Sequence, residues 1–191
     1  MAIKNIFVIG AGTMGNGIAQ VSAQAGYSVT MSDIKDEFVS KGMAAIEKSL
    51  DRMIKKGTLQ ENEKTEIMAR IKTTTDTGDA KDADLVIEAA PEVLELKKSI
   101  FKQLAEVCKA DAILATNTSS LPIGEIAAAT GRADKVIGIH FMNPVPVMKG
   151  VEVIPGRNTS EETLAAAKEY VKSIDKEPCE ARDYAGFIVS R

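Results

Sequence analysis

The architecture of this chain follows from residues 4–15, which read Lys4-Asn5-Ile6-Phe7-Val8-Ile9-Gly10-Ala11-Gly12-Thr13-Met14-Gly15. The short run of β-branched and aromatic residues predicts a buried parallel strand, and the small apolar residues after Gly15 predict a helix. Between them, Gly10 allows a sharp turn, Gly12 leaves room for a ligand to approach the backbone, and Gly15 lets the helix pack on the strand. The pattern is therefore strand, tight turn and helix.

A turn of this kind is typical of a dinucleotide site. The pyrophosphate would lie on the free N–H groups at the positive end of the helix that begins near Thr13 and Met14. A second β-rich run, residues 28–32, ends at Asp33, whose carboxylate would accept hydrogen bonds from an adenosine ribose and repel a 2′-phosphate. NAD(H) is therefore favoured over NADP(H). The alternative is a glycine turn in an ordinary strand-helix-strand unit, with Asp33 a solvated loop residue.

Length and composition limit the classes of protein to which this chain can belong. The 191 residues suffice for one well-buried domain, and a net charge of −3 without a run of like charge argues against a nucleic-acid-binding surface. Two distant cysteines, Cys108 and Cys179, and a single histidine indicate neither a disulfide framework nor a metal site. The first residues predict neither a secretory signal nor a membrane span. We expect a cytoplasmic protein that acts on a small molecule, with no nucleic acid and no membrane among its partners.

Strands and helices alternate along the rest of the chain. Apolar runs predict strands at residues 71–75, 84–90, 112–115 and 135–139, separated by helical patterns such as residues 94–108. Short connections imply right-handed crossovers and a parallel sheet covered on both faces. Residues 150–154 predict a strand that pairs antiparallel, followed by a helix at 160–174 and a strand at 177–180. The predicted fold class is α/β, a Rossmann-type doubly wound, mostly parallel sheet with antiparallel strands at one edge.

A helical hairpin is predicted as an insertion in this sheet. Residues 36–56 and 60–70 carry apolar side chains at helical spacing. The outer face of the hairpin is rich in lysine, including Lys48, Lys55 and Lys56. The plainer interpretation is a solvated face, and the alternative is a surface that presents lysines to an anionic ligand tail.

Small polar side chains gather where the predicted parallel strands end. Glu92 follows the fourth strand, Asn117 and Ser119 follow the fifth, and His140 and Asn143 follow the sixth. Ligands of open α/β sheets bind beyond the carboxyl ends of the strands. These residues therefore share the predicted binding edge.

His140 is the only imidazole in the chain and is either structural or catalytic. Its place at the binding edge, with Glu152 on the next strand in reach, favours catalysis. A carboxylate bonded to one ring nitrogen fixes the tautomer and leaves the other nitrogen to exchange a proton. Interconversion of an alcohol and a ketone needs that proton transfer beside the redox chemistry of a nicotinamide. Ser119 offers a hydroxyl to the substrate oxygen or, alternatively, caps a helix before Ile123.

Five segments in order resemble the NAD-binding domain of 3-hydroxyacyl-CoA dehydrogenases. These segments are Gly10–Gly15, Ile87-Glu88-Ala89, Asn117-Thr118-Ser119-Ser120-Leu121, His140-Phe141-Met142-Asn143-Pro144 and Val151-Glu152-Val153-Ile154. The likeness covers the whole chain and is greatest to the bacterial 3-hydroxybutyryl-CoA dehydrogenases of butyrate formation. It implies an NAD(H)-dependent oxidoreductase of fatty acid metabolism that interconverts acetoacetyl-CoA and (S)-3-hydroxybutyryl-CoA.

The resemblance also implies a role for individual residues. His140 would be the general acid and base, Glu152 its partner, and Ser119 a contact of the substrate. The implied cofactor contacts are Gly10, Gly12, Thr13, Met14, Gly15, Asp33, Glu92, Lys97, Asn117 and Asn143. The implied contacts with the CoA-thioester substrate are Ser49, Lys56, Ser119, Asn143 and Ser190.

The chain departs from the family pattern at several points. Ser190 stands where asparagine is usual, Ala185 where proline is usual, and Gly150 where leucine is usual. By the resemblance, residues 1–183 form the dinucleotide-binding domain and residues 184–191 begin a linker or helix. This segment would lead to an all-helical domain that the sequence lacks, which would close over the substrate and support a homo-oligomer of the full-length form. Two alternatives stay open: a related dehydrogenase of free hydroxy acids, and a non-catalytic dinucleotide-binding module or truncated chain.

Overall fold

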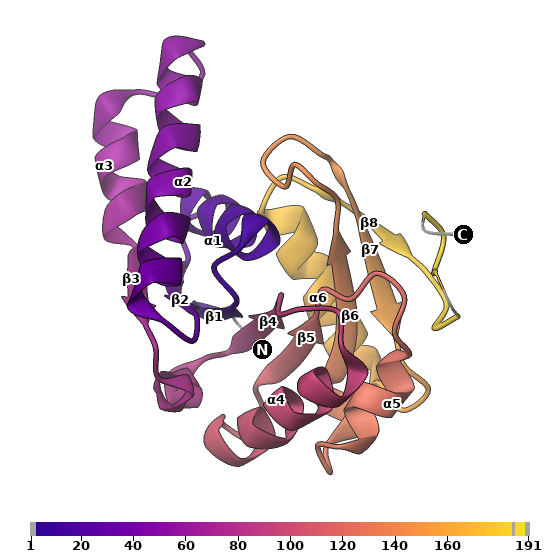
Figure 1. Ribbon diagram of the computed structural model, residues 1–191. Coiled ribbons are helices and arrows are strands. Elements are labelled where there is room, and N and C mark those ends of the chain that lie inside the picture. Colours follow the sequence, from indigo (N-terminus) through magenta and orange to yellow (C-terminus); the bar gives the residue numbers. More distant parts are fainter. Residues whose placement is uncertain (1–2, 185, 190–191) are drawn as a thin grey trace.

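The computed structural model describes residues 3–184 and 186–189. The strands are β1 (Asn5–Ile9), β2 (Ser28–Ser32), β3 (Ile71–Thr74), β4 (Leu85–Glu88), β5 (Ile113–Thr116), β6 (Val136–Phe141), β7 (Gly150–Pro155) and β8 (Glu177–Glu180). The helices are α1 (Thr13–Gln24), α2 (Asp36–Lys55), α3 (Glu61–Ala69), α4 (Leu94–Val107), α5 (Ile123–Ala128) and α6 (Glu161–Ser173), with short 3-10 turns η1 (Thr77–Asp82) and η2 (Ala133–Lys135). Strands and helices thus alternate much as the sequence predicts (Figure 1).

The strands join in one sheet in the order β3-β2-β1-β4-β5-β6-β7-β8. All neighbours from β3 to β6 run parallel, and β7 pairs antiparallel with β6. Because β8 pairs parallel with β7, both of these strands run against the rest of the sheet. The strand order reverses between β1 and β4, and the carboxyl ends of these two strands therefore flank a crevice. The predicted Rossmann-type sheet with antiparallel strands at one edge is confirmed.

Side chains of each strand alternate between two apolar layers. Ile6 and Val8 of β1 pack in the layer that includes Ile18 of α1, whereas Phe7 packs in the layer that includes Phe101 of α4. Figure 1 shows α4 and α5 in front of the strands and α6 behind them. With both faces covered by helices, polar groups can gather at the strand ends without interrupting the core.

The predicted hairpin is formed by α2 and α3 and rises beside α1 at the upper left of Figure 1. Near the start of α2, the hairpin packs closely on the glycine turn. A Cβ added at Gly42 would lie only 2.8 Å from the Ala11 carbonyl oxygen. The backbone N–H of Gln60 donates to Glu63 Oε2 at 2.7 Å and caps α3. The hairpin is therefore anchored at the turn that the sequence assigns to the dinucleotide.

β6 is longer than the sequence predicts. Phe141 pairs with Val151 of β7, so the antiparallel ladder continues through His140 and Phe141. His140 is therefore the second-last residue of β6 and is only 6 % exposed. The sequence instead predicts that His140 lies in the loop after this strand. Because successive side chains of a strand point to opposite faces of the sheet, the position of His140 within β6 fixes the direction of its side chain.

The C-terminal segment is described only in part. Residues 186–189 form turns, and the prediction of a linker or helix that begins at residues 184–191 stays a prediction. Phe187 adopts the left-handed region at φ 46° and buries its side chain in the layer of α4 and α5. Ala185 and Ser190, singled out by the resemblance, lie outside the described residues.

Within residues 3–184 and 186–189, no helix combines the length and apolar character needed to cross a membrane. The same ranges contain no cluster of three or more His, Cys, Asp or Glu side chains that could hold a metal ion. Both cysteines are free thiols, Cys108 buried and Cys179 exposed.

The glycine turn generates a prediction about stability. A Cβ at Gly15 would lie 1.6 Å from the carbonyl oxygen of Gly10, whereas a Cβ at Gly12 would meet no atom within 4 Å. Gly15→Ala should therefore lower the free energy of unfolding by about 3 kcal/mol or more. Gly12→Ala, the matched control, should lower it by less than about 1 kcal/mol. Urea denaturation of both variants measures the difference, and equal losses would contradict the packing described here.

Candidate active site

The glycine turn is open on the side where a ligand would approach. Gly10, with φ 93°, turns the chain away from β1, and its N–H donates to the carbonyl oxygen of Ser32 at 2.8 Å. Gly12 is the N-cap residue of α1 and contributes no side-chain hydrogen bond. The first-turn N–H groups of α1, from Thr13 to Gly15, thus keep their capacity to bind an anion. Together with the free space above Gly12, this turn fits a pyrophosphate.

Asp33 lies directly after β2, as predicted, and is half-buried. Its Oδ2 accepts from the N–H of Ala11 at 2.8 Å, and its Oδ1 accepts from the N–H of Ile34 at 2.7 Å. These bonds fix the carboxylate against the glycine turn and leave lone pairs on both oxygens. The arrangement fits the two hydroxyls of an adenosine ribose.

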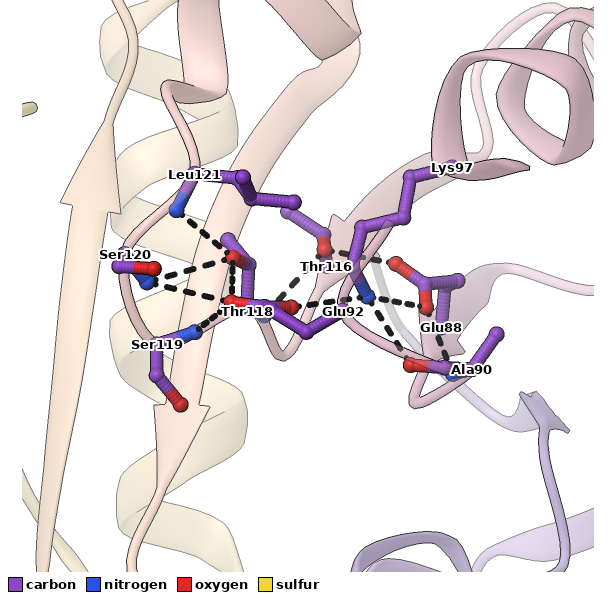
Figure 2. Close-up of polar contacts among 9 residues, drawn as sticks. All are labelled: Glu88, Ala90, Glu92, Lys97, Thr116, Thr118, Ser119, Ser120 and Leu121. Carbon is purple, nitrogen blue, oxygen red and sulfur yellow. Dashed lines mark hydrogen bonds and ion pairs between the residues drawn. The ribbon is translucent and has the colours of Figure 1, made fainter. Parts of the chain in front are cut away.

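Glu92 and Lys97 lie on the other side of the crevice and contact each other (Figure 2). Glu92 Oε1 accepts from Thr118 Oγ1 at 2.5 Å and from the N–H of Ser119 at 2.8 Å. Partial burial raises the pKa of Glu92, but these bonds and the charge of Lys97 outweigh burial and lower it. Lys97 is only 1 % exposed, and its Nζ donates to Glu88 Oε1 at 2.6 Å. Both residues are thus engaged with protein groups at the strand ends.

Asn117 and Ser119 follow β5 as predicted. Asn117 Oδ1 accepts from the N–H of Phe141 at 2.8 Å, which ties this loop to the end of β6. Ser119 is exposed. The alternative role of Ser119 as a helix cap is wrong, because Pro122 is the N-cap residue of α5 and contributes no side-chain hydrogen bond. The carboxylate of Asp183 accepts instead from Ile123 N and Gly124 N, both at 2.9 Å.

His140 and Glu152 form a directly opposed pair across β6 and β7. His140 Nδ1 lies 2.6 Å from Glu152 Oε2, and Glu152 is 2 % exposed. Glu152 Oε1 also accepts from the backbone N–H groups of Ile188 at 2.8 Å and Val189 at 3.0 Å. The ionised carboxylate of Glu152 can only accept hydrogen bonds. In the neutral His140 ring, the proton therefore lies on Nδ1, which donates it to Glu152.

The second ring nitrogen of His140, Nε2, is free of protein partners among the described residues. Nε2 forms no hydrogen bond with the described residues, yet it does not appear among their buried unsatisfied atoms. Nε2 therefore retains some solvent-exposed surface. The ring of Phe187 lies against the imidazole, with 6.0 Å between ring centroids, and shields one side of it.

The remaining predicted residues lie around this edge or on the hairpin. Asn143 is exposed in the loop after β6. Ser49 is half-buried on α2, and Lys56 is exposed just after it. No hydrogen bond or ion pair among the described residues links Ser49 or Lys56 to the strand-end groups. Ser190 falls outside these residues.

Several residues that the sequence places at this edge were given no individual role. Glu88, at the end of β4, and Thr116, at the end of β5, are both buried and bonded to each other. Thr118 bonds Glu92. A charged residue inside an otherwise apolar run, as in residues 84–90, is the signal in the sequence that could have identified Glu88.

The open glycine turn, the carboxylate after β2 and the polar strand ends define a dinucleotide-binding domain of the Rossmann class. The family model "3-hydroxyacyl-CoA dehydrogenase, NAD binding domain" matches residues 5–184. The chain therefore belongs to the 3-hydroxyacyl-CoA dehydrogenase family, and the matched region is the NAD-binding domain. The predicted cofactor, NAD, is confirmed at the level of the family.

Relatives and solved structures agree with this assignment. The chain is 48 % identical over 184 residues to a 3-hydroxybutyryl-CoA dehydrogenase of Clostridioides difficile, covering 96 % of this chain and 66 % of the relative. It is 46 % identical to that of Bradyrhizobium diazoefficiens, covering 99 % and 64 %. The structure of (S)-3-hydroxybutyryl-CoA dehydrogenase PaaH1 from Ralstonia eutropha superimposes with a TM-score of 0.97 at 48 % identity, covering 98 % and 66 %. The chain thus spans about two thirds of the length of these relatives.

The bonds to Glu92 generate a prediction about pH. Thr118→Val removes the 2.5 Å hydrogen bond to Oε1, so the pKa of Glu92 should rise from its lowered value toward the ordinary 4.5. Because the pKa of Glu92 is lowered in the folded protein, the ionised carboxylate stabilises the fold fully above pH 4.5. This stabilisation is lost as the pH falls through the pKa of Glu92 in the folded protein. Thr118→Val should reduce that loss.

Carboxyl-carbon NMR titration measures the pKa of Glu92 directly. Ser120→Ala is the matched control, because Ser120 donates to Glu92 through its backbone N–H, which the substitution keeps. An equal pKa of Glu92 in Thr118→Val and in the unmodified protein would contradict this effect of the hydrogen bond.

Proposed function

We propose that this chain carries the reactive centre of an NAD(H)-dependent oxidoreductase that interconverts acetoacetyl-CoA and (S)-3-hydroxybutyryl-CoA. Membership in the 3-hydroxyacyl-CoA dehydrogenase family and the names of its relatives support this substrate class. The observation that carries the proposal is the His140–Glu152 pair, with Nδ1 held by a carboxylate and Nε2 partly exposed and without a partner among the described residues.

His140 performs the proton transfer in this proposal. Bound NAD(H) supplies the two-electron redox chemistry. In the direction of reduction, the charged ring donates the Nε2 proton to the oxygen of the substrate carbonyl, and the neutral ring remains. In the direction of oxidation, Nε2 accepts the hydroxyl proton. Glu152, fixed by the amides of Ile188 and Val189, stabilises the positive charge of the ring and prevents it from rotating.

Three further residues bind the reactants in this proposal. The exposed hydroxyl of Ser119 bonds the substrate oxygen that exchanges the proton. Asn117, whose Oδ1 is used by the N–H of Phe141, keeps two amide N–H groups for a carbonyl of the nicotinamide or of the substrate. Asn143, exposed in the loop after β6, bonds the same part of the pocket.

The CoA part of the substrate is assigned to the hairpin. Lys48, Lys55 and Lys56 are exposed and form no ion pair with other described residues, so their charges are available to phosphate groups. Ser49 and Lys56 contact the CoA moiety in this proposal. The resemblance further supports a homo-oligomer of the full-length form, a cytoplasmic location and a role in butyrate synthesis. It also supports a dinucleotide-binding domain at residues 1–183 and the start of a linker or helix at residues 184–191.

The proton-transfer role generates a kinetic prediction. His140→Ala should lower kcat for acetoacetyl-CoA by about 10²- to 10⁴-fold, because none of the other described residues assigned to the substrate oxygen has a side chain that titrates near neutral pH. The affinity for NADH should not change, since His140 does not lie at the glycine turn or at Asp33. Loss of NADH absorbance measures turnover, and fluorescence titration measures binding.

The same assay separates the proposal from its alternatives. Free acetoacetate should be reduced far more slowly than its CoA thioester; equal rates would favour a dehydrogenase of free hydroxy acids. NADH binding without any turnover would favour a non-catalytic binding module. Turnover that survives unchanged in His140→Ala would remove His140 from the reaction.

A further inference from the structure

Lys176 is a buried cation to which the reaction proposed above gives no role. It directly precedes β8, is only 7 % exposed, and forms no ion pair with another described residue. Burial lowers the pKa of its ammonium group, because the charged form loses its hydration. A charge buried without a carboxylate destabilises the fold unless its N–H groups find other acceptors. The acceptors that Lys176 finds therefore indicate its role.

These acceptors belong to the loop between β6 and β7, residues 142–149. Lys176 Nζ donates to the carbonyl oxygen of Val145 at 2.7 Å and to that of Met148 at 2.6 Å. Within the loop, the N–H groups of Val147 and Met148 both donate to the carbonyl oxygen of Pro144 at 3.0 Å. One ammonium group thus binds two carbonyls of the same turn and holds that turn closed.

The loop between β6 and β7 also packs on α1 (Figure 1). Val145 is 2 % exposed, and a Cβ added at Gly17 of α1 would lie 2.8 Å from Val145 Cβ. Only a glycine at position 17 lets the helix approach the loop this closely. Val145 is therefore fixed both by α1, through its side chain, and by Lys176, through its carbonyl oxygen.

Asn143 is the residue of this loop that the proposed function assigns to the reactants. It is exposed and lies between two fixed points of the backbone, Phe141 and Val145. The N–H of Phe141 donates to Asn117 Oδ1 at 2.8 Å, and the carbonyl oxygen of Val145 accepts from Lys176. An exposed side chain on a loop keeps a defined place only when the loop itself is held. Release of Val145 would therefore release Asn143.

We propose that Lys176 is a positioning residue, which holds the loop between β6 and β7 so that Asn143 stays in place to bind the reactants. The inference rests on the proposed function for the role of Asn143. The attachment of the loop is measured separately, by a method that does not depend on turnover.

Hydrogen exchange followed by NMR measures the attachment of the loop. Lys176→Met removes the ammonium and keeps the apolar stem. The N–H groups of Val147 and Met148 should then exchange about 10-fold faster or more. Lys149→Met is the matched control, because Lys149 lies in the same loop but is exposed and pairs with Asp175. Exchange that stays unchanged in Lys176→Met, or that accelerates equally in the control, would overturn the proposal.

A double-mutant cycle separates positioning from a general loss of stability. Lys176→Met and Asn143→Ala should each lower kcat/KM for acetoacetyl-CoA by about 10-fold or more. Because both changes remove the same contact with the reactants, the double variant should lose little more than the worse single variant. Lys149→Met should keep the unmodified kcat/KM. Losses that multiply in the double variant, or an unmodified kcat/KM in either single variant, would contradict the proposal.

Gly17→Ala is the second variant, since Lys176→Met leaves two carbonyls without their donor and can prevent folding. Its Cβ pushes on Val145 from α1, while alanine itself suits a helix. Gly17→Ala should reproduce the faster exchange and the lower kcat/KM. An unmodified kcat/KM in Gly17→Ala would by itself overturn the proposal.

The Kd of ADP-ribose, which lacks the nicotinamide, tests whether the effect is confined to the loop. It should be unchanged in Lys176→Met and in Gly17→Ala, and weakening that equals the loss of kcat/KM would overturn the proposal. Absence of acetoacetyl-CoA turnover in the unmodified protein, with the exchange rates as expected, would reject the proposed function and leave the attachment of the loop to Lys176 supported.

Discussion

The structure of the site depends on one buried carboxylate, Glu152, and on the reversal of the strand that carries it. The antiparallel ladder of β6 and β7 places Glu152 directly opposite His140. Once buried, the carboxylate requires donors, and the imidazole and the amides of Ile188 and Val189 supply them. The β6–β7 ladder thus favours the tautomer of His140 that carries its proton on Nδ1 and leaves Nε2 unprotonated.

The other strand ends follow the same principle. Glu88 and Glu92 share the cation of Lys97, and Asn117 is fixed by the backbone of β6. Among the described residues, Arg132 Nε is the one buried side-chain polar atom without a partner, and it lies outside this edge. Fully satisfied polar networks are rigid, so the groups at the crevice are held in place before a ligand binds.

Much of this fold could be predicted from the sequence, because β-rich runs, helical spacing and glycine turns are local signals. The site could be predicted only in part. Asp33 and the His140–Glu152 pair follow from strand order, but the inclusion of His140 in β6 depends on pairing of Phe141 with Val151. The cap of α5 comes from Asp183, sixty residues along the chain from Ile123, and no local pattern indicates it. Likewise, the burial of Lys97 depends on two carboxylates from other segments.

The central claim is that Glu152 holds the proton of the neutral imidazole on Nδ1 and leaves Nε2 as the exchanging atom. Because the chain has one histidine, ¹⁵N NMR of histidine-labelled protein reports this ring without ambiguity. The account predicts a protonated Nδ1 and an unprotonated Nε2 in the neutral ring, with the Nε2 resonance alone shifting strongly when NAD(H) and substrate bind. A neutral ring protonated on Nε2, or an Nε2 resonance unchanged by both ligands, would contradict it.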